Sequence, residues 1–271
     1  LLSRGLGDVY KRQAFDLLAY SGSHLGAGDG WERRSLSRLS GTLIDAAIMV
    51  TPTVVSAGTE IPVVAIDPHT GRADLPTVES DSFGGALTAT RHLIELGHRR
   101  IGFVAGRPDL RSAGLRDAGY RRALSDAGIP LDPSLVGIGR YELDATRESA
   151  RIMLSGESRP TAIFAANDLS AIAVIDVAHE LGLRVPDDLS VIGFDDVPEA
   201  TRRALPLTTI QQPMRRLGAV AADMVFTQLS GQEIDEMHVI LPTRLVVRAT
   251  TAPPRCCLLY TSPSPRDKRQ S

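Results

Sequence analysis

The stretch AIFAANDLSA, residues Ala162–Ala171, contains the pattern on which the fold prediction rests. Its apolar part, Ala162–Ala166, has the length of a strand that is buried on both faces. The polar pair Asn167-Asp168 then begins a helix-like segment that ends at Gly182. Polar caps before helices and glycines after them are the usual boundaries. The stretch therefore predicts one strand–helix unit of a parallel sheet.

The same unit recurs along the chain. The predicted strands are Phe15–Tyr20, Ala46–Val50, Val63–Ile66, Ile101–Ala105, Leu135–Ile138, Ala162–Ala166 and Val191–Phe194. The predicted helices run from about Phe83 to Leu96, Ser112 to Ala127, Asp144 to Gly156, Asp168 to Gly182 and Pro213 to Gly231. The closing segment, Val239–Thr250, is predicted to form a strand pair interrupted at Pro242. Strands that alternate with helices favour doubly wound parallel sheets in an α/β fold.

The two ends of the chain differ in composition from the rest. All lysines and cysteines lie near an end, at Lys11, Cys256, Cys257 and Lys268. The DNA word GATGTGTATAAGAGACAG translates as Asp8–Gln13, and its reverse complement, read one base in, translates as Cys257–Ser262. A chance pair of tails is the alternative interpretation. We interpret residues 1–13 and 256–271 as non-native, adapter-like tails and exclude them from the fold prediction.

Charge and composition exclude several classes of protein. The whole chain carries a formal net charge of −2, and residues 1–13 and 256–271 each contribute +2, so residues 14–255 carry −6. Proteins that bind nucleic acid show a basic patch, so this acidic body is not expected to contact DNA directly. Without the tails no cysteine remains for a disulfide scaffold or a thiolate metal site. No apolar run approaches the length of a membrane span.

Polar side chains follow four successive predicted strands. They are Arg107 and then Arg116 after the first strand, Arg140 and Tyr141 after the second, Asn167 and Asp168 after the third, and Asp195 and Asp196 after the fourth. Ligands of open parallel sheets bind beyond the carboxyl ends of the strands, so these residues are predicted to line one ligand edge. An aromatic face with donors and acceptors suits a neutral polyhydroxylated ligand. For Asn167 or Asp195 alone, capping of a helix or turn is the alternative role.

Three further motifs are interpreted as structural. Gly26–Gly30 lacks the spacing of a phosphate-binding loop and is interpreted as a turn. The carboxylates of Asp195 and Asp196 are not expected to converge, because neighbouring side chains of an extended chain point to opposite sides. His92 and His98 lie at a predicted helix end, where the helix dipole favours a cation. No nucleophile–base pair or metal-ligand cluster stands out, so we expect no enzyme, no metal and no cofactor.

Five stretches in this order resemble the lactose/galactose repressor (LacI/GalR) family of bacterial transcription regulators. They are HLIELGHRRI (His92–Ile101), AIFAANDLSA (Ala162–Ala171), VIGFDD (Val191–Asp196), PLTTIQQP (Pro206–Pro213) and LPTRLVVRAT (Leu241–Thr250). The resemblance implies a periplasmic-binding-protein-like fold with two doubly wound parallel-sheet lobes and three crossovers. It also implies a cytoplasmic homodimer in which a small effector, a sugar or a related polyol or nucleoside, binds between the lobes and modulates operator DNA binding.

The resemblance also implies site residues. Arg116 (in RDAGY), Asn167 (in AND) and Asp195 (in GFDD) match positions that hold the effector in family members. Tyr141 falls near an aromatic residue that stacks on the effector, and Asp81 lies at the first expected crossover.

The expected crossovers define two lobes. The crossovers are expected near Val78–Asp81, near Ile210–Gln212 and between Gln232 and Val239. The N-terminal lobe would then comprise residues 14–79 and 211–232, and the C-terminal lobe residues 80–210 and 239–255.

Relative to the family, the segment before Phe15–Tyr20 is expected to lack a helix-turn-helix, a hinge helix, a first strand and a first helix. Operator binding would belong to that missing domain, and the N-terminal lobe would be incomplete and unstable in isolation. An extracytoplasmic sugar-binding protein of a transport system is the main alternative, and a doubly wound enzyme is a third. A helix-turn-helix or a signal peptide encoded upstream would discriminate the first two, and turnover of a sugar would support the third.

Overall fold

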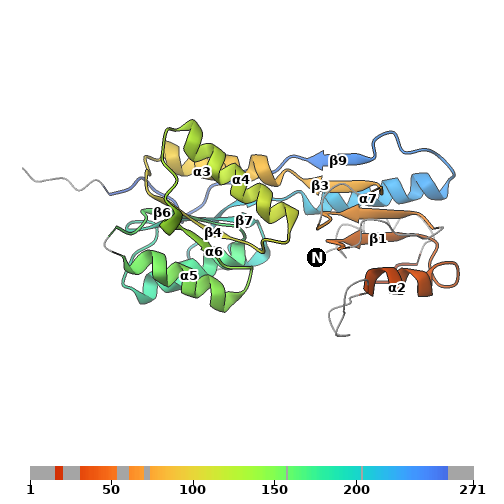
Figure 1. Ribbon diagram of the computed structural model, residues 1–271, viewed down its shortest axis with the longest axis horizontal. Coiled ribbons are helices and arrows are strands. Elements are labelled where there is room, and N and C mark those ends of the chain that lie inside the picture. Colours follow the sequence, from red (N-terminus) through yellow and green to blue (C-terminus); the bar gives the residue numbers. More distant parts are fainter. Residues whose placement is uncertain are drawn as a thin grey trace, which may run out of the picture.

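The computed structural model describes residues 16–20, 31–53, 61–69, 74–156, 158–202 and 204–255. Within these ranges the chain forms two lobes that lie end to end (Figure 1). One lobe is built on a six-stranded sheet and the other on a four-stranded sheet. The predicted tails and the predicted turn at Gly26–Gly30 lie outside the described residues.

The C-terminal lobe contains the six-stranded sheet, in the order β10-β8-β7-β6-β4-β5. Its strands are β4 (Ile101–Ala105), β5 (Val136–Ile138), β6 (Ala162–Ala165), β7 (Ser190–Asp195), β8 (Thr208–Gln211) and β10 (Arg244–Val246). All neighbours pair in parallel except β10, which is antiparallel to β8. The four strands that were predicted to share one ligand edge therefore do lie in one sheet.

Two pairs of helices cover the faces of this sheet. The helices are α3 (Ser82–Glu95), α4 (Arg111–Asp126), α5 (Leu143–Ser155) and α6 (Asp168–Glu180), with short 3-10 turns at Pro133–Leu135 and Pro198–Ala200. Along β6, Phe164 packs in the core under α3 and α4, whereas Ile163 packs in the core under α5 and α6. Both faces of the strand are buried, which explains its continuous apolar sequence.

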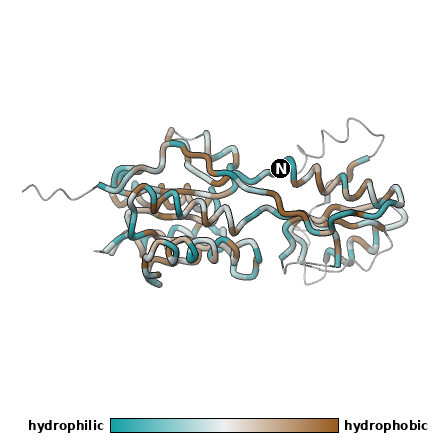
Figure 2. Tube along the Cα trace, turned by 90° about the horizontal axis from the view of Figure 1, so that it is seen from above, coloured by the Kyte–Doolittle hydropathy of each residue, from teal (hydrophilic) through white to brown (hydrophobic). Residues whose placement is uncertain are grey.

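The N-terminal lobe is a parallel sheet in the order β1-β2-β3-β9. Its strands are β1 (Ala47–Val50), β2 (Val63–Ile66), β3 (Thr77–Ser80) and β9 (His238–Leu241). Helix α7 (Met214–Leu229) packs on one face, and α2 (Trp31–Leu39) contributes Leu36 to a smaller cluster with Val63. Figure 2 shows hydrophobic segments along the inside of both lobes and hydrophilic segments at their outer turns.

The chain passes between the lobes after β3, after β8 and after β9. The first two crossings, at Asp81 and at Gln212, fall within the ranges expected from the sequence. The third expectation was wrong, because β9 pairs with β3 as far as Leu241 and the crossing follows at Pro242. Residues 239–241 thus lie in the N-terminal sheet. Strand β9 ends before Pro242 because proline has no N–H to donate to a neighbouring strand.

Other differences from the prediction concern strands. Residues 16–20 of the predicted strand Phe15–Tyr20 form no regular structure, and Leu17 and Leu18 are exposed. Strands β3 and β8 were not predicted as strands, because their sequences TVES and TTIQ are largely polar although both are mostly buried. The two strands of the closing segment do not pair with each other: β9 joins β3, and β10 joins β8.

Candidate functional site

A buried arginine lies where the C-terminal sheet faces the other lobe. Arg116, on α4, is 5% exposed, and its guanidinium carbon lies 3.8 Å from the ring centre of Phe194. Its Nη1 atom donates to the carbonyl of Ala166 at 2.5 Å and lies 3.6 Å from Oδ1 of Asp195. These three groups hold the Arg116 guanidinium in place. They engage only some of its five N–H donors, so others remain for a ligand.

The carboxylate of Asp195 ends β7 beside this arginine. The side chain is one quarter exposed, and its Oδ1 atom also accepts a 2.6 Å hydrogen bond from Nε2 of Gln212. Burial raises the pKa of the Asp195 carboxyl group, while Arg116 and Gln212 oppose that rise. Both contacts use Oδ1, and no partner for Oδ2 is seen among the described residues. Oδ2 is therefore the acceptor that a ligand can use.

Asp196 takes different partners from its neighbour. It accepts hydrogen bonds from Gln211 and Arg248, each at 2.6 Å. The carboxylates of Asp195 and Asp196 therefore bind different side chains and do not converge on one ligand. The reason is not the alternation of an extended chain. The backbone at Asp195 and Asp196 is not extended: both φ angles are positive, at 115° and 60°.

Tyr141 brings an aromatic ring to the same cluster. It follows β5 with a positive φ of 61°, and its ring packs on the backbone of Gly106, at the end of β4. A Cβ atom at Gly106 would lie 2.1 Å from Cζ of the ring, so a larger residue there would have to displace the Tyr141 ring. Burial raises the pKa of the Tyr141 hydroxyl, and a hydrogen bond with Arg116 opposes the rise. The structure thus brings Arg116, Tyr141 and Asp195 together.

The other two predicted site residues are helix caps. Oδ1 of Asn167 accepts from the Ser170 N–H at 2.9 Å and caps α6, and Oδ1 of Asp81 accepts from the Gly84 N–H at 2.7 Å and caps α3. Asn167 still borders the cluster, because it directly follows Ala166. The cap of Asp81 lies at the first crossover, and no contact with Arg116 is seen for it within the described ranges.

Sequence reasoning missed a carboxylate from the opposite lobe. Asp67 follows β2 with a positive φ of 47°, and its Oδ1 lies 3.4 Å from the Ser80 nitrogen. Burial raises the pKa of this carboxyl group to about 6, Arg116 opposes the rise, and Asp195 adds to it. Asp67 is therefore near the cluster. The test of polar residues after each strand, applied to Val63–Ile66, would have found it.

The lobes also touch through charged side chains beside the cluster. Arg111 begins α4 and forms an ion pair with Glu79 of β3, whose side chain is 8% exposed. The Arg111 N–H donates to the carbonyl of His69 at 3.0 Å, and Nδ1 of His69 lies 3.9 Å from Asp109. These contacts join the end of the N-terminal sheet to the loop before α4.

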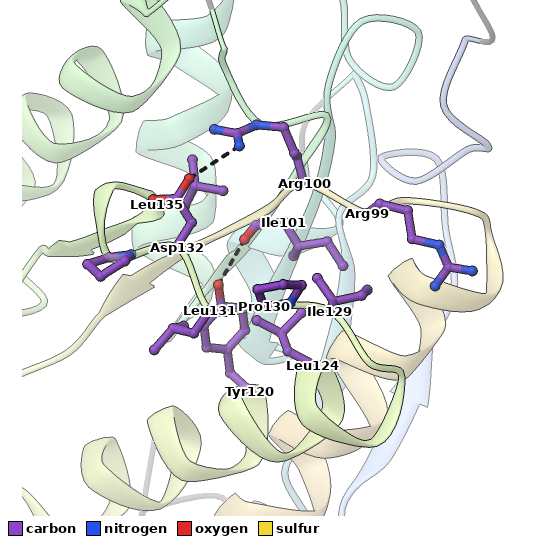
Figure 3. Close-up of a pocket in the computed structure, with 11 residues that line it drawn as sticks. Arg99, Arg100, Ile101, Tyr120, Leu124, Ile129, Pro130, Leu131, Asp132 and Leu135 are labelled. Carbon is purple, nitrogen blue, oxygen red and sulfur yellow. Dashed lines mark hydrogen bonds and ion pairs between the residues drawn. The ribbon is translucent and has the colours of Figure 1, made fainter.

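A cavity of about 450 Å³ lies at the other end of the C-terminal sheet (Figure 3). Its wall is mainly apolar and includes the start of β4 and the end of α4. The Tyr120 hydroxyl donates to the Ile101 carbonyl at 2.8 Å, and Arg100 binds Asp132 and the Ser158 carbonyl. These polar groups of the wall are already paired with protein atoms, so the cluster at Arg116 is the stronger candidate for recognition of a polar ligand.

His92 and His98 make hydrogen bonds within the protein, and burial opposes their protonation. His98 is 1% exposed and contacts Thr161, Ser190 and the Ala252 carbonyl at 2.8, 3.1 and 2.9 Å. Burial lowers the pKa of both His98 and His92. Burial therefore disfavours the cation that the helix dipole was expected to favour. Among the described residues there is no cluster that could hold a metal, and none of their helices is long and apolar enough to cross a bilayer.

Comparison with known proteins places this geometry in a family. The family described as periplasmic binding protein-like domain matches residues 90–251. The HTH-type transcriptional repressor PurR of Aliivibrio salmonicida is 38% identical over 195 residues, which cover 69% of this chain and 57% of that protein. The chain thus spans less than two thirds of the length of this relative.

Solved structures agree with the sequence comparison. The transcriptional regulator CelR in complex with cellobiose superposes with a TM-score of 0.80 at 29% identity, over 92% of this chain and 77% of that chain. A LacI family regulator from Enterococcus faecium with bound ribose gives a TM-score of 0.80 at 25% identity, over 93% of each chain. The chain belongs to the periplasmic-binding-protein-like domain family, and it is similar to structures of LacI family transcription regulators.

Proposed function

We propose that this chain is the ligand-sensing domain of a bacterial DNA-binding transcription regulator. A small polyhydroxylated effector, of the sugar class, binds between the lobes and changes the affinity of the whole regulator for its operator. The regulator acts as a homodimer in the cytoplasm, by binding and without turnover. Operator DNA is read by a helix-turn-helix domain outside residues 14–255, which carry a net charge of −6 and suit DNA poorly.

The cluster around Arg116 is the observation that carries this proposal. Arg116 offers hydrogen-bond donors, Oδ2 of Asp195 offers an acceptor, and Tyr141 offers an aromatic face. A sugar presents hydroxyl groups that both donate and accept, on a ring with apolar C–H faces. The combination of few polar groups and one aromatic wall is typical of small-molecule sites.

Asp67 extends this recognition to the N-terminal lobe. Its carboxyl group is close enough to Arg116 and Asp195 for their charges to act on its pKa. An effector that contacts Asp67 and Asp195 together binds more tightly when the lobes are closed than when they are open. Such differential affinity is what allows a ligand to shift a conformational equilibrium. Asn167, beside the cluster, is proposed as a further contact through its amide group, and Asp81 as a contact at the crossover.

The comparisons support the regulator over the transport protein. The similar proteins are described as transcription regulators, and two similar structures are described with bound cellobiose and bound ribose. These sugars are therefore the first probes for this chain.

The proposal is tested by calorimetric titration of the chain with cellobiose, ribose and a panel of monosaccharides. Arg116→Ala and Asp195→Ala should each weaken binding of the sugar found by about 1–3 kcal/mol, the cost of removing one buried hydrogen-bond partner. Arg100→Ala, at the distant cavity, is the control and should leave affinity unchanged. Unchanged affinity in both site variants would disprove the assigned site.

A further inference from the structure

Two adjacent glutamines at the end of β8 hold the two adjacent aspartates at the end of β7. Nε2 of Gln211 donates to Oδ2 of Asp196, and Nε2 of Gln212 donates to Oδ1 of Asp195, both at 2.6 Å. The local chemistry of the two pairs is the same. They differ in what the other end of each amide contacts.

Gln211 contacts only its own lobe in the hydrogen bonds seen. Its Oε1 atom accepts from Nη2 of Arg244, on β10, at 2.9 Å. Asp196 in turn accepts from Arg248, which also donates to the Leu207 carbonyl at 2.8 Å. This outer pair thus links neighbouring parts of the C-terminal lobe.

Gln212 joins the two lobes. Its Oε1 atom accepts from the hydroxyl of Ser80, the last residue of β3 in the N-terminal sheet, and Ser80 is 3% exposed. The same amide group donates to Asp195, whose Oδ1 lies 3.6 Å from Arg116. One side-chain amide therefore spans from a buried strand of one lobe to the ligand-facing carboxylate of the other.

We propose that Gln212 is a positioning residue that sets the orientation of the Asp195 carboxylate according to the placement of the N-terminal lobe. The inference rests on the effector site proposed above. The donor and the acceptor of one amide group lie a fixed distance apart, so both hydrogen bonds of Gln212 form only within a narrow range of distances between Ser80 and Asp195. Movement at the second crossover breaks the hydrogen bond between Ser80 and Gln212. The Gln212 amide can then rotate, and Asp195 loses the hydrogen bond that holds its carboxylate in place. Effector affinity and lobe placement are thereby linked, and the link acts in both directions.

The first test needs no ligand. The carboxyl group of Asp195 is titrated by ¹³C NMR in the wild-type chain and in three variants. Gln212→Ala should raise the pKa of Asp195, because the donated hydrogen bond that lowers it is removed. Ser80→Ala should raise it by a smaller amount, because the amide keeps its contact with Asp195 but loses its anchor. Gln211→Ala is the matched control and should leave it unchanged.

The second test uses cellobiose and ribose as probes in calorimetric titrations. For whichever sugar binds, Gln212→Ala should reduce affinity about tenfold and Gln211→Ala less than twofold. The double variant Ser80→Ala/Gln212→Ala should bind no more weakly than Gln212→Ala alone, because both changes break one linkage.

The outcomes separate the two proposals. If neither these sugars nor the wider panel bind the wild-type chain, the effector proposal fails while the NMR titration still decides the role of Gln212. If Gln212→Ala leaves the pKa of Asp195 unchanged, or if Gln211→Ala has the same effects as Gln212→Ala, the positioning role is overturned. The Ser80 variant removes a single oxygen and keeps the test open if Gln212→Ala does not fold.

Discussion

Asp168 carries a carboxyl group that is fully buried at the start of α6. Its oxygens accept from the Thr209 hydroxyl at 2.5 Å and from the Val197 N–H at 2.9 Å. A Cβ atom at Gly193 would lie 2.3 Å from Oδ1, so glycine makes room for the carboxyl group there. Burial raises the pKa of Asp168 to about 7, and Asp195 and Asp196 add to the rise.

This residue should make stability depend on pH. In the unfolded chain the carboxyl group ionises near its ordinary pKa of about 3.9, whereas in the folded chain it keeps its proton until about pH 7. The free energy of unfolding should therefore fall as the pH rises between these values, by about 1.4 kcal/mol for each unit of pKa difference. Asp168→Asn should flatten this dependence in urea unfolding measured between pH 5 and pH 7.5. An equal slope in wild type and variant would contradict the assignment.

The structure brings three of the five predicted site residues together, whereas the other two cap helices. Arg116, Tyr141 and Asp195 come together because the ends of neighbouring parallel strands meet at one edge of the sheet. Asn167 and Asp81 lie at helix N-termini, and no sequence pattern separates a cap from a ligand contact at such a position. The direction of the His98 pKa shift depends on burial, which its sequence context does not reveal.

Among the secondary-structure elements, α4 contains two glycines with opposite expected effects. Gly119 faces α3, and a Cβ atom there would lie 2.5 Å from the Phe83 carbonyl oxygen and 2.9 Å from the Leu87 nitrogen. Gly114 is exposed, and a Cβ atom there would meet no atom within 4 Å. The close approach of α3 and α4 therefore depends on Gly119 and not on Gly114.

Gly119→Ala should destabilise the chain, since backbone atoms cannot give way as a flexible side chain can, and overpacking costs about 1–3 kcal/mol. Gly114→Ala should stabilise it by about 0.5–1 kcal/mol, because alanine loses less backbone entropy than glycine in a helix. Urea unfolding of both variants measures the difference. A destabilising Gly114→Ala or a neutral Gly119→Ala would show that the packing of the two helices is not as described.

Some strands and helices could be predicted from the sequence, and others could not. Strands such as β4 and β6 are apolar on both faces, and helices such as α3 end next to a glycine, so both signals are local and were found. Strand β3 was missed because Thr77, Glu79 and Ser80 look like loop residues, and their burial depends on contacts distant in sequence. Thr77, for example, bonds to His238, on β9.

For the whole molecule, the contact between Arg111 and Glu79 is expected to hold the lobes together. Arg111→Met keeps much of the apolar stem but leaves the Glu79 carboxylate without its cation, and a hydrogen bond to a charged group contributes about 1.5–3 kcal/mol. The ligand-free variant should show a larger radius of gyration in small-angle X-ray scattering. Arg121→Met is the matched control, because Arg121 pairs with Asp117 on its own helix, α4. A scattering curve identical to that of the wild type would rule out the holding role.

The arrangement of the two lobes was predicted from resemblance, and its error has a physical cause. Hydrophobic pattern identifies a strand but does not say which sheet it joins, because the pairing partner lies far away in sequence. Strand β9 pairs with β3 across 161 positions, from Thr77 to His238. The third crossover was therefore placed too early in the chain, before β9 instead of at Pro242.

The three crossovers are tied to one another as well as to the lobes. The Asp81 N–H donates to the Leu241 carbonyl at 2.8 Å, and the Thr243 hydroxyl donates to the Asp81 carbonyl at 3.3 Å, while Ser80 binds Gln212. We infer that three connections hydrogen-bonded side by side move together as one hinge. In the function proposed above, an effector would then act by changing how far this hinge is closed.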